Sequence, residues 1–456
     1  MSSSSGASTS SAGRAQPGMV KIVTASLVGT TIEWYDFFLF GSVAALVFNK
    51  LFYPDFDPVV GTLLSLSTFA VGFVARPVGA VVFGHFGDLV GRKKMLVLSL
   101  VLMGAATVAV GLLPTYAQIG VAAPILLVVC RLLQGFAVGG EWGGAVLMVS
   151  ERGDTRRRGF WSSWPNVGLP AGQALSIAVL VVLGAVLSDD AFLGWGWRVP
   201  FLLSGLLLVV GLWIRLSLDE SPMFKEAQAA RQAEGAPRKA PLFEVLRHYW
   251  REVLLVMGAR LCENTSGYIF TVFILTYATQ QGLSRQVALY AVMTASVCHM
   301  IAVPTWGALS DRFGRRPLYI GGAVGVGIWV FAVFPLIDLG SPVLLTLAVA
   351  VALICHGGML GPQGALFSEL FGTSVRYSGA SIGVQFASIF GGSLAPIIAV
   401  ALFAAYDSAV PVAIYVAATA AITVVALLLT RETARRDLAF DDTATSRTPA
   451  VTGTEK

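Results

Sequence analysis

The chain has 456 residues, of which 55% are hydrophobic and 12% are charged, and its mean hydropathy is +0.75. With this few polar residues, the chain cannot cover a water-facing surface of its size. The composition therefore excludes a water-soluble globular protein and predicts a protein that crosses a bilayer many times. The formal net charge of +5 reflects basic residues gathered between the apolar stretches, which is a topology signal and not a sign of nucleic-acid binding.

Twelve apolar segments are each long enough to cross the bilayer as a helix, which takes about 20 residues. They are predicted near 21–48, 60–86, 95–113, 118–148, 160–187, 197–216, 251–279, 287–309, 318–337, 342–366, 375–404 and 409–430. We therefore expect an all-α membrane protein with halves at 21–216 and 251–430, joined by a charged connection at 217–250. Residues 1–20 and 431–456 are predicted to be disordered tails, and the Ser-rich first tail lacks the apolar region of a signal peptide.

Charged residues lie inside the first two predicted spans. Glu33, Tyr35 and Asp36 fall about 12 to 15 residues into the first span, near the bilayer midplane at 1.5 Å per residue. A charge at this depth costs roughly 2.5–3.5 kcal/mol and normally faces a cavity or a partner. We therefore expect Asp36, or else Glu33, to exchange a proton and Tyr35 to contact a substrate, unless the acids form an ion pair that only holds helices together. Arg76, beside Pro77 in the second span, is equally compatible with a role in gating the transport path and a role in binding substrate.

A charged sequence between the second and third spans, GHFGDLVGRKK at 84–94, recurs between the eighth and ninth as GALSDRFGRRP at 307–317. A second pair of motifs recurs at a similar offset, so the chain is predicted to form two homologous, pseudo-symmetric six-helix bundles. We expect these motifs to make the charge contacts that open and close one side of the protein, although a plain topology signal is the alternative. The residues are Asp88, Gly91 and Arg92 with Asp311, Gly314 and Arg315, and Glu151 and Arg158 with Glu369 and Arg376.

The fourth predicted span carries a polar stripe that begins at Arg131. Around the helix, Gln134 lies about 60° and Glu141 about 80° from Arg131, and Trp142 about 20° to its other side. A guanidinium binds a carboxylate in a bidentate fork. We therefore expect Arg131, Gln134 and Trp142 to bind an anionic substrate and Glu141 to be a further candidate for proton exchange. A permanent Arg131–Asp36 ion pair is the alternative.

The second half has different polar residues. Arg260 and Glu263 share a face of the seventh span, where they either serve substrate binding and proton exchange or simply pair within the helix. His299 and His356 are predicted to be isolated, and an isolated buried histidine is more often a packing residue than a proton carrier. The residues of this half expected to contact substrate are Arg260, Asn264, His356 and Gln385.

Lys and Arg concentrate on the side of the spans that holds the charged repeats. The positive-inside rule therefore predicts that this side, both termini and 217–250 are cytoplasmic. The four cysteines lie singly in apolar spans, and the sequence has no metal-binding spacing, phosphate loop or catalytic signature. These observations favour a carrier without metal or cofactor over a membrane enzyme or a sensor.

The repeated charged motifs resemble the loop motif of the major facilitator superfamily, which lies between the second and third helix of each six-helix half. Further motifs resemble the metabolite:proton symporters of that superfamily, and 260–283 is most similar to the shikimate transporters. The resemblance covers essentially 20–430, and its other motifs are TIEWYDFFLFG at 31–41, RLLQGFAVGGEWGGA at 131–145, WGWRVPF at 195–201 and LFGTSVRYSGAS at 370–381.

This resemblance implies a multi-pass transporter of the inner (plasma) membrane, working as a monomer by alternating access around a midplane site. The implied partners are the lipid bilayer, a proton and a small carboxylated metabolite such as shikimate. Alternatives are dicarboxylates or tricarboxylates, osmolytes such as proline or betaine, and an uncoupled facilitator. The sequence at 168–172 does not match the motif of superfamily antiporters, which favours uptake.

Overall fold

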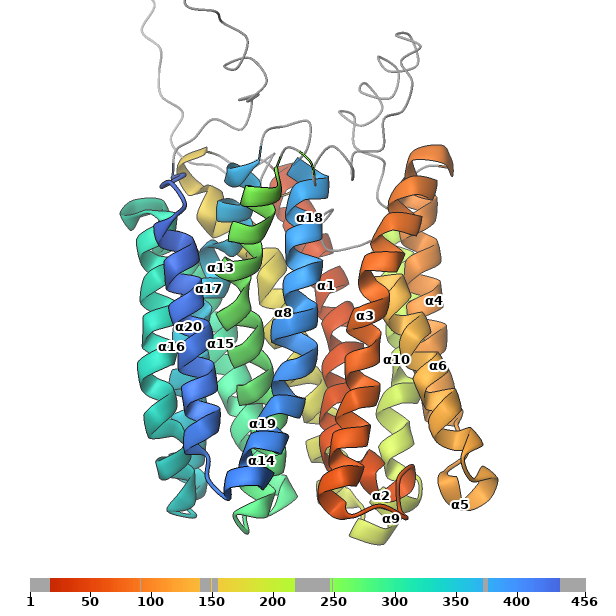
Figure 1. Cartoon of the computed structure of the whole chain (residues 1–456). Coiled ribbons are helices and arrows are strands. Elements are labelled where there is room, and N and C mark those ends of the chain that lie inside the picture. Colours follow the sequence, from red (N-terminus) through yellow and green to blue (C-terminus); the bar gives the residue numbers. More distant parts are fainter. Residues whose placement is uncertain are drawn as a thin grey trace, which may run out of the picture.

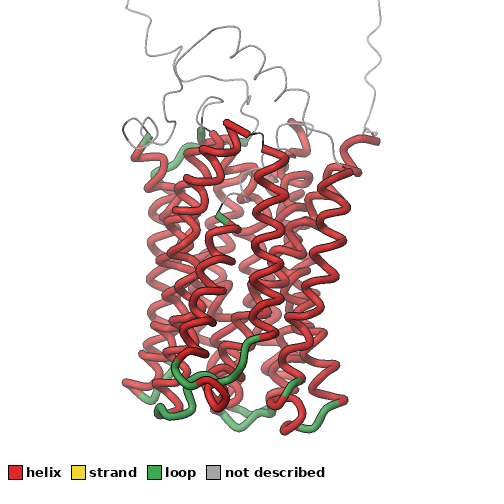
Figure 2. Tube along the Cα trace, turned by 90° about the vertical axis from the view of Figure 1, so that its right-hand side faces the viewer, coloured by secondary structure: helices red, strands yellow, loops and turns green. Residues whose placement is uncertain are grey.

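The computed structural model describes residues 17–90, 92–139, 149, 155–217, 247, 249–371 and 376–434. This part of the chain consists of helices and the turns between them, with no strand. The long helices run side by side and the connections lie at their two ends (Figures 1 and 2). The prediction of an all-α membrane protein is confirmed.

The first half contains six helical columns and several short connecting helices. Its elements are α1 (Pro17–Val43), η1 (Ala44–Phe48), α2 (Asn49–Leu51), α3 (Pro58–Val90), α4 (Arg92–Leu112), α5 (Tyr116–Ile119), α6 (Ala122–Val138), η2 (Thr155–Arg157), α8 (Arg158–Val186), α9 (Asp189–Gly194), η3 (Gly196–Arg198) and α10 (Val199–Ser217). Most columns agree with the predicted spans to within a few residues, but α3 continues past 86 and α6 ends at Val138, because residues 140–148 of the predicted fourth span lie outside the described residues. Asp88 and Arg92 therefore lie on helices and not on a loop, because a helix need not end at the membrane surface.

The second half repeats this plan. Its elements are α13 (Trp250–Tyr268), η4 (Ile269–Phe273), α14 (Ile274–Gln280), α15 (Arg285–Phe313), α16 (Arg315–Asp338), α17 (Pro342–Leu370), α18 (Arg376–Ala387), η5 (Ser388–Ser393), α19 (Leu394–Tyr406) and α20 (Val410–Leu428). A π-helical segment widens the first column of each half, η1 after α1 and η4 after α13. The second motif also lies on helices on either side of Gly314, with residues 307–313 on α15 and residues 315–317 on α16.

Hydropathy accounts for most of these columns. Nine helices among the described residues are long and apolar enough to cross a membrane, and 97–112 and 122–138 are shorter apolar helices. The α13 column is less apolar because Glu252, Arg260 and Glu263 lie on it. The twelve-helix, two-bundle fold is thereby established, while the exact boundaries predicted for the halves stay a prediction.

The two halves meet along two contacts between columns. In one, α8 packs against α15 and α17; in the other, α3 packs against α18, η5 and α19. Helix α1 begins and α20 ends at the upper side of the bundle in Figure 1, which we call the terminus side.

Within the first half, α3 and α6 approach so closely that only glycine fits between them. A Cβ atom on Gly135 would lie 1.8 Å from the carbonyl oxygen of Gly72, and one on Gly139 would lie 2.0 Å from that of Arg76. Since Arg131 is one turn from Gly135 on α6, this contact holds its side chain against α3.

Candidate functional site

An aromatic cluster lies between the halves, midway along their columns. Phe37, Phe69 and Phe73 of the first half surround Tyr268 of the second, and all four are buried. Ring centroids are 4.8 Å apart for Phe37 and Phe73, 5.6 Å for Phe69 and Tyr268, and 5.5 Å for Phe73 and Tyr268. We call Phe37, Phe69, Phe73 and Tyr268 the aromatic cluster. Sequence reasoning missed it, because aromatic residues are common in any membrane span.

Two arginines lie against this cluster. The Cζ atom of Arg131 is 4.0 Å from the ring centroid of Phe37, and that of Arg76 is 4.2 Å from the same centroid. A cation–π contact of a desolvated guanidinium is worth about 2 kcal/mol. The rings therefore hold both charges inside the bilayer at reduced cost.

Each of the two guanidinium groups has an N–H donor without a hydrogen-bond partner. Arg131 donates from Nε to the carbonyl oxygen of Phe69 at 3.2 Å and from Nη1 to Oε1 of Gln134 at 3.1 Å, but its Nη2 has no hydrogen-bond partner. The Nε of Arg76 also lacks one. Among the described residues, no carboxylate forms an ion pair with either arginine. Two buried cations with unused donors suit an anionic ligand.

Asp36 is buried but does not pair with Arg131, so the alternative of a permanent ion pair is wrong in this structure. Its carboxylate accepts hydrogen bonds from Oγ1 of Thr107 at 3.0 Å and Oγ of Ser204 at 2.5 Å. Nε2 of Gln134 donates to Thr107 at 2.8 Å, and Gln134 also bonds to Arg131. A chain of hydrogen bonds from α6 through α4 to α1 thus replaces the direct contact. The hydroxyls were missed because sequence does not show which helices are neighbours.

The other predicted substrate residues of the first half have different surroundings. The hydroxyl of Tyr35 donates to the carbonyl oxygen of Pro200 at 2.9 Å, so it faces α10 and not the aromatic cluster. Glu33 is buried. Glu141 and Trp142 lie outside the described residues.

In the second half, Arg260 and Glu263 form a buried ion pair with 3.4 Å between Nη1 and Oε2, so of the two alternatives left open by the sequence this structure shows the pair within the helix. Arg260 also donates to Gln363 on α17. Asn264 lies 3.5 Å from the hydroxyl of Ser388, and the buried Gln385 has an unpartnered Oε1. These residues extend the polar environment from α13 to α17 and α18.

His299 and His356 are not isolated, so that prediction was wrong. Nδ1 of His356 is 3.0 Å from Nε2 of His299, and Nε2 of His356 is 2.9 Å from the carbonyl oxygen of Glu263. Each histidine is the only one on its helix, and their contact arises from the packing of α15 against α17.

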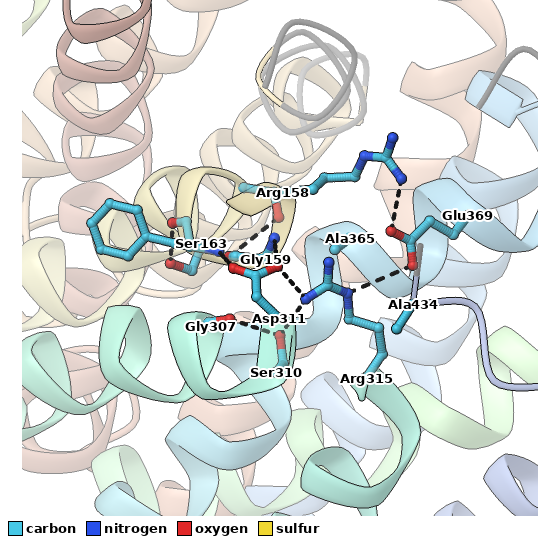
Figure 3. Close-up of polar contacts among 12 residues, drawn as sticks. Arg158, Gly159, Ser163, Gly307, Ser310, Asp311, Arg315, Ala365, Glu369 and Ala434 are labelled. Carbon is cyan, nitrogen blue, oxygen red and sulfur yellow. Dashed lines mark hydrogen bonds and ion pairs between the residues drawn. The ribbon is translucent and has the colours of Figure 1, made fainter. Parts of the chain in front are cut away.

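Charged residues join the halves on the terminus side (Figure 3). Asp311 on α15 accepts hydrogen bonds from the backbone N–H groups of Gly159 at 2.8 Å and Phe160 at 2.9 Å, at the start of α8. Arg158 pairs with Glu369 on α17 at 3.0 Å. These contacts fasten the first half to the second on this side.

Arg315 completes this network. Its Nη1 is 2.7 Å from Asp311 and its Nε is 3.6 Å from Glu369. Gly314, between α15 and α16, has φ of 99°, a conformation that favours glycine. The other residues of the two motif pairs are not described: Gly91 and Glu151 lie outside the described residues, as do the side chains of Asp88 and Arg92 in the first half and of Arg376 in the second.

The halves also touch on the side opposite the termini. Nη2 of Arg285 is 2.6 Å from Oδ1 of Asp189, and Nε2 of Gln286 donates to the carbonyl oxygen of Val181 at 2.9 Å. The aromatic cluster is therefore enclosed from both sides. A cavity of about 960 Å³ lies elsewhere, in an apolar groove between α1, α8, α10 and α15; its lining has none of the buried charged residues, so we place the candidate site at the cluster.

Two family models match the chain, one on each half. The model "Sugar (and other) transporter" matches residues 21–239, and the model "Major Facilitator Superfamily" matches residues 256–453. The inner membrane metabolite transport protein YhjE of Escherichia coli K12 is 44% identical over 92% of this chain and 95% of its own length. The chain belongs to the major facilitator superfamily.

Other relatives transport different solutes. The shikimate transporter of Escherichia coli K12 is 41% identical over 90% of this chain and 94% of its own, and the proline/betaine transporter of that strain is 33% identical over 92% and 84%. A crystal structure of a D-xylose-proton symporter superposes with a TM-score of 0.70 at 18% identity, over 92% of this chain and 99% of that one. The protein is thus a multi-pass metabolite transporter of this superfamily and not an enzyme.

Proposed function

We propose that this transporter imports a small carboxylated metabolite together with protons by alternating access around the aromatic cluster. The observation that supports this most is the pair of buried guanidinium groups, Arg76 and Arg131, which share the Phe37 ring and have unused donors. A carboxylate bound there would satisfy donors that otherwise stay unpaired in a water-free environment.

Charge balance supports coupling to a proton. The described residues buried midway along the columns include equal numbers of arginines and acids: Arg76, Arg131 and Arg260 with Glu33, Asp36 and Glu263. A bound anion adds an uncompensated negative charge, which is costly in the membrane. A proton on Asp36 offsets that charge, and the hydrogen-bond chain through Gln134 and Thr107 connects Asp36 to the guanidinium that would bind the anion.

The substrate class follows from the same charges. Shikimate, proline and betaine each contain a carboxylate, but the latter two also contain a cationic nitrogen. A cation beside Arg76 and Arg131 would be repelled by two guanidiniums. We therefore favour an anion of the shikimate type over the osmolytes.

Alternating access would use the contacts on both sides. The basic bias of the sequence supports a cytoplasmic terminus side, so that Asp311, Arg315, Arg158 and Glu369 would form the inner gate. A substrate released there has been imported.

Uptake into proteoliposomes tests this proposal. Labelled shikimate, succinate, citrate, proline and betaine are offered with and without an inward proton gradient, and internal pH is followed with a dye. We expect shikimate or a similar monoanion to accumulate with proton entry. Accumulation of betaine alone, or uptake that ignores the proton gradient, would overturn the proposal.

A further inference from the structure

The histidine pair in the second half lies at the depth of the candidate site. Glu263, His299 and His356 each occur about 13 or 14 residues into α13, α15 and α17, or about 20 Å at 1.5 Å per residue. All three side chains are buried, with 2%, 2% and 1% of their surface exposed. Three titratable groups from three helices thus meet near the midplane of the second bundle.

Hydrogen bonding determines which nitrogens carry protons in the neutral pair. The carbonyl oxygen of Glu263 can only accept, so Nε2 of His356, 2.9 Å away, must be the protonated nitrogen. Nδ1 of neutral His356 is then an acceptor, and Nε2 of His299, 3.0 Å away, must donate to it. Nδ1 of His299 is left with a lone pair. One additional proton can therefore bind at Nδ1 of His299 without breaking either hydrogen bond.

The same geometry allows the positive charge to pass from one imidazole to the other. When Nδ1 of His299 gains a proton, its Nε2 proton can pass to Nδ1 of His356, which leaves His299 neutral and His356 an imidazolium. Nε2 of His356 lies 3.9 Å from Oε1 of Glu263. Transfer of that Nε2 proton to the carboxylate would neutralise Glu263 and release Arg260 from its 3.4 Å ion pair. Each histidine gains one proton and gives one up, and the transferred proton ends on Glu263, so the relay needs no other reactant.

The surrounding groups define this site further. Among the described residues, the charged groups beside His356 are Glu263, whose Oε1 lies 3.9 Å from its Nε2, and Arg260, which pairs with Glu263. His299 contacts His356 through its Nε2. On α16, Tyr319 accepts a hydrogen bond from Gln363, which in turn accepts from Arg260. Glu263 is therefore the sole described acid that can stabilise the protonated pair.

The pair is also adjacent to the aromatic cluster. A Cβ atom on Gly267 would lie 3.1 Å from Nε2 of His356, and the next residue, Tyr268, belongs to the cluster. A displacement of α13 on substrate binding would therefore change the contact of Gly267 with His356 and the contact of Tyr268 with the aromatic cluster together.

From these contacts we propose that His299 and His356 form a second proton-binding site, which passes its proton to Glu263 during transport. This inference rests on the proposed proton-coupled import and extends it. With one proton offsetting the substrate's charge at Asp36, a second proton makes each import of a monoanion carry net positive charge. Loss of that proton lowers the greatest accumulation at 100 mV by about 50-fold.

The test is the ratio of protons to substrate, obtained from the reversal potential of substrate flux in proteoliposomes. We expect two protons per shikimate for the native protein and one for His299→Gln and for His356→Gln. Exchange of labelled for unlabelled substrate by His299→Gln should stay within about twofold of native, because exchange moves no net protons. Ser296→Ala is the matched control, since Ser296 is buried one turn away on α15 and its hydroxyl donates only to its own helix.

The outcomes separate the two proposals. A native protein without proton movement overturns the proposed function itself. A native ratio of one, or an unchanged ratio in His299→Gln, leaves proton-coupled import standing and overturns the second site. If the glutamine variants do not insert, ¹⁵N NMR of histidine-labelled native protein decides: we expect substrate to change the protonation of a buried imidazole, and no such change overturns the site.

Discussion

The guanidinium of Arg131 and the carboxylate of Asp36 do not contact each other but are joined by a chain of hydrogen bonds. Gln134 and Thr107 connect them through hydrogen bonds of 3.1, 2.8 and 3.0 Å that cross three helices. An ion pair would hold both charges permanently, whereas this chain leaves Nη2 of Arg131 without a hydrogen-bond partner and Asp36 bonded only to hydroxyl groups among the described residues. In the proposed mechanism, binding of an anion at one end and of a proton at the other favour each other, which coupled transport requires.

Replacing Arg131 by lysine should impair uptake strongly. Lysine keeps the charge but loses the planar fork and the contacts with Phe37 and Gln134. We expect a loss of about 10- to 100-fold in initial uptake rate at low substrate, the range for roughly 1.5–3 kcal/mol of charge-assisted hydrogen bonding. Arg285→Lys, at the partly exposed pair on the opposite side, is the control. Normal uptake by Arg131→Lys would show that Arg131 does not clamp a carboxylate.

Replacing Asp36 by asparagine should lower the ratio of protons to substrate by one and reduce accumulation against a gradient, while sparing exchange of labelled for unlabelled substrate. The amide cannot exchange a proton, but it still accepts a hydrogen bond from Thr107 or Ser204. Thr107→Val should weaken coupling in the same direction, because it interrupts the chain and leaves the carboxylate in place. An unchanged ratio of protons to substrate in Asp36→Asn would transfer the coupling role to Glu33, Glu141 or Glu263.

Replacing Asp311 by asparagine should open the terminus side. The variant loses the negative charge that binds Arg315 and the N–H groups of Gly159 and Phe160. If the closed state loses about 1–2 kcal/mol of stability relative to the open state, the population of the open state rises by a factor of about 5–30. The measurement is maleimide labelling of a cysteine at Ser163, which is fully buried between the halves.

The control for this gate is Asp189→Asn on the opposite side. Asp189 pairs with Arg285 but its side chain is 85% exposed, and exposed ion pairs contribute little. We expect the cysteine at Ser163 to react with maleimide at the same rate in Asp189→Asn as in the protein with the native Asp189. Asp88→Asn should act like Asp311→Asn if the first motif has the same role. Equal labelling of Asp311→Asn and native protein would mean that Asp311 does not close the gate.

Replacing Gly135 by alanine should destabilise the first bundle. The added methyl group would meet the carbonyl oxygen of Gly72 at 1.8 Å, so α3 and α6 must separate. Overpacking of this kind costs about 1–3 kcal/mol and should lower the Tm in detergent and displace Arg131. Gly194→Ala, where nothing lies within 4 Å of the new atom, should melt like the native protein. Equal Tm values for both variants would contradict the close packing.

The sequence by itself determined the class of this protein, the number of its spans and the depth of its charged residues. A bilayer admits only helices or closed barrels with satisfied backbone groups, and a helix needs an apolar stretch of a definite length. Those constraints are local, so Asp36, Arg131 and the seventh-span pair of Arg260 and Glu263 were located correctly along their helices. The internal repeat likewise required only comparison of the chain with itself.

Only the tertiary structure decided which polar groups touch. Inside a bilayer, lipid-facing and core-facing residues are both apolar, so hydropathy does not show how each helix is rotated or which helix it packs against. The contact of His299 with His356, the hydroxyls around Asp36 and the shared Phe37 ring between Arg76 and Arg131 all join different helices. Such contacts depend on long-range packing, through close approaches like that of Gly72 and Gly135, and no periodicity within a single helix encodes them.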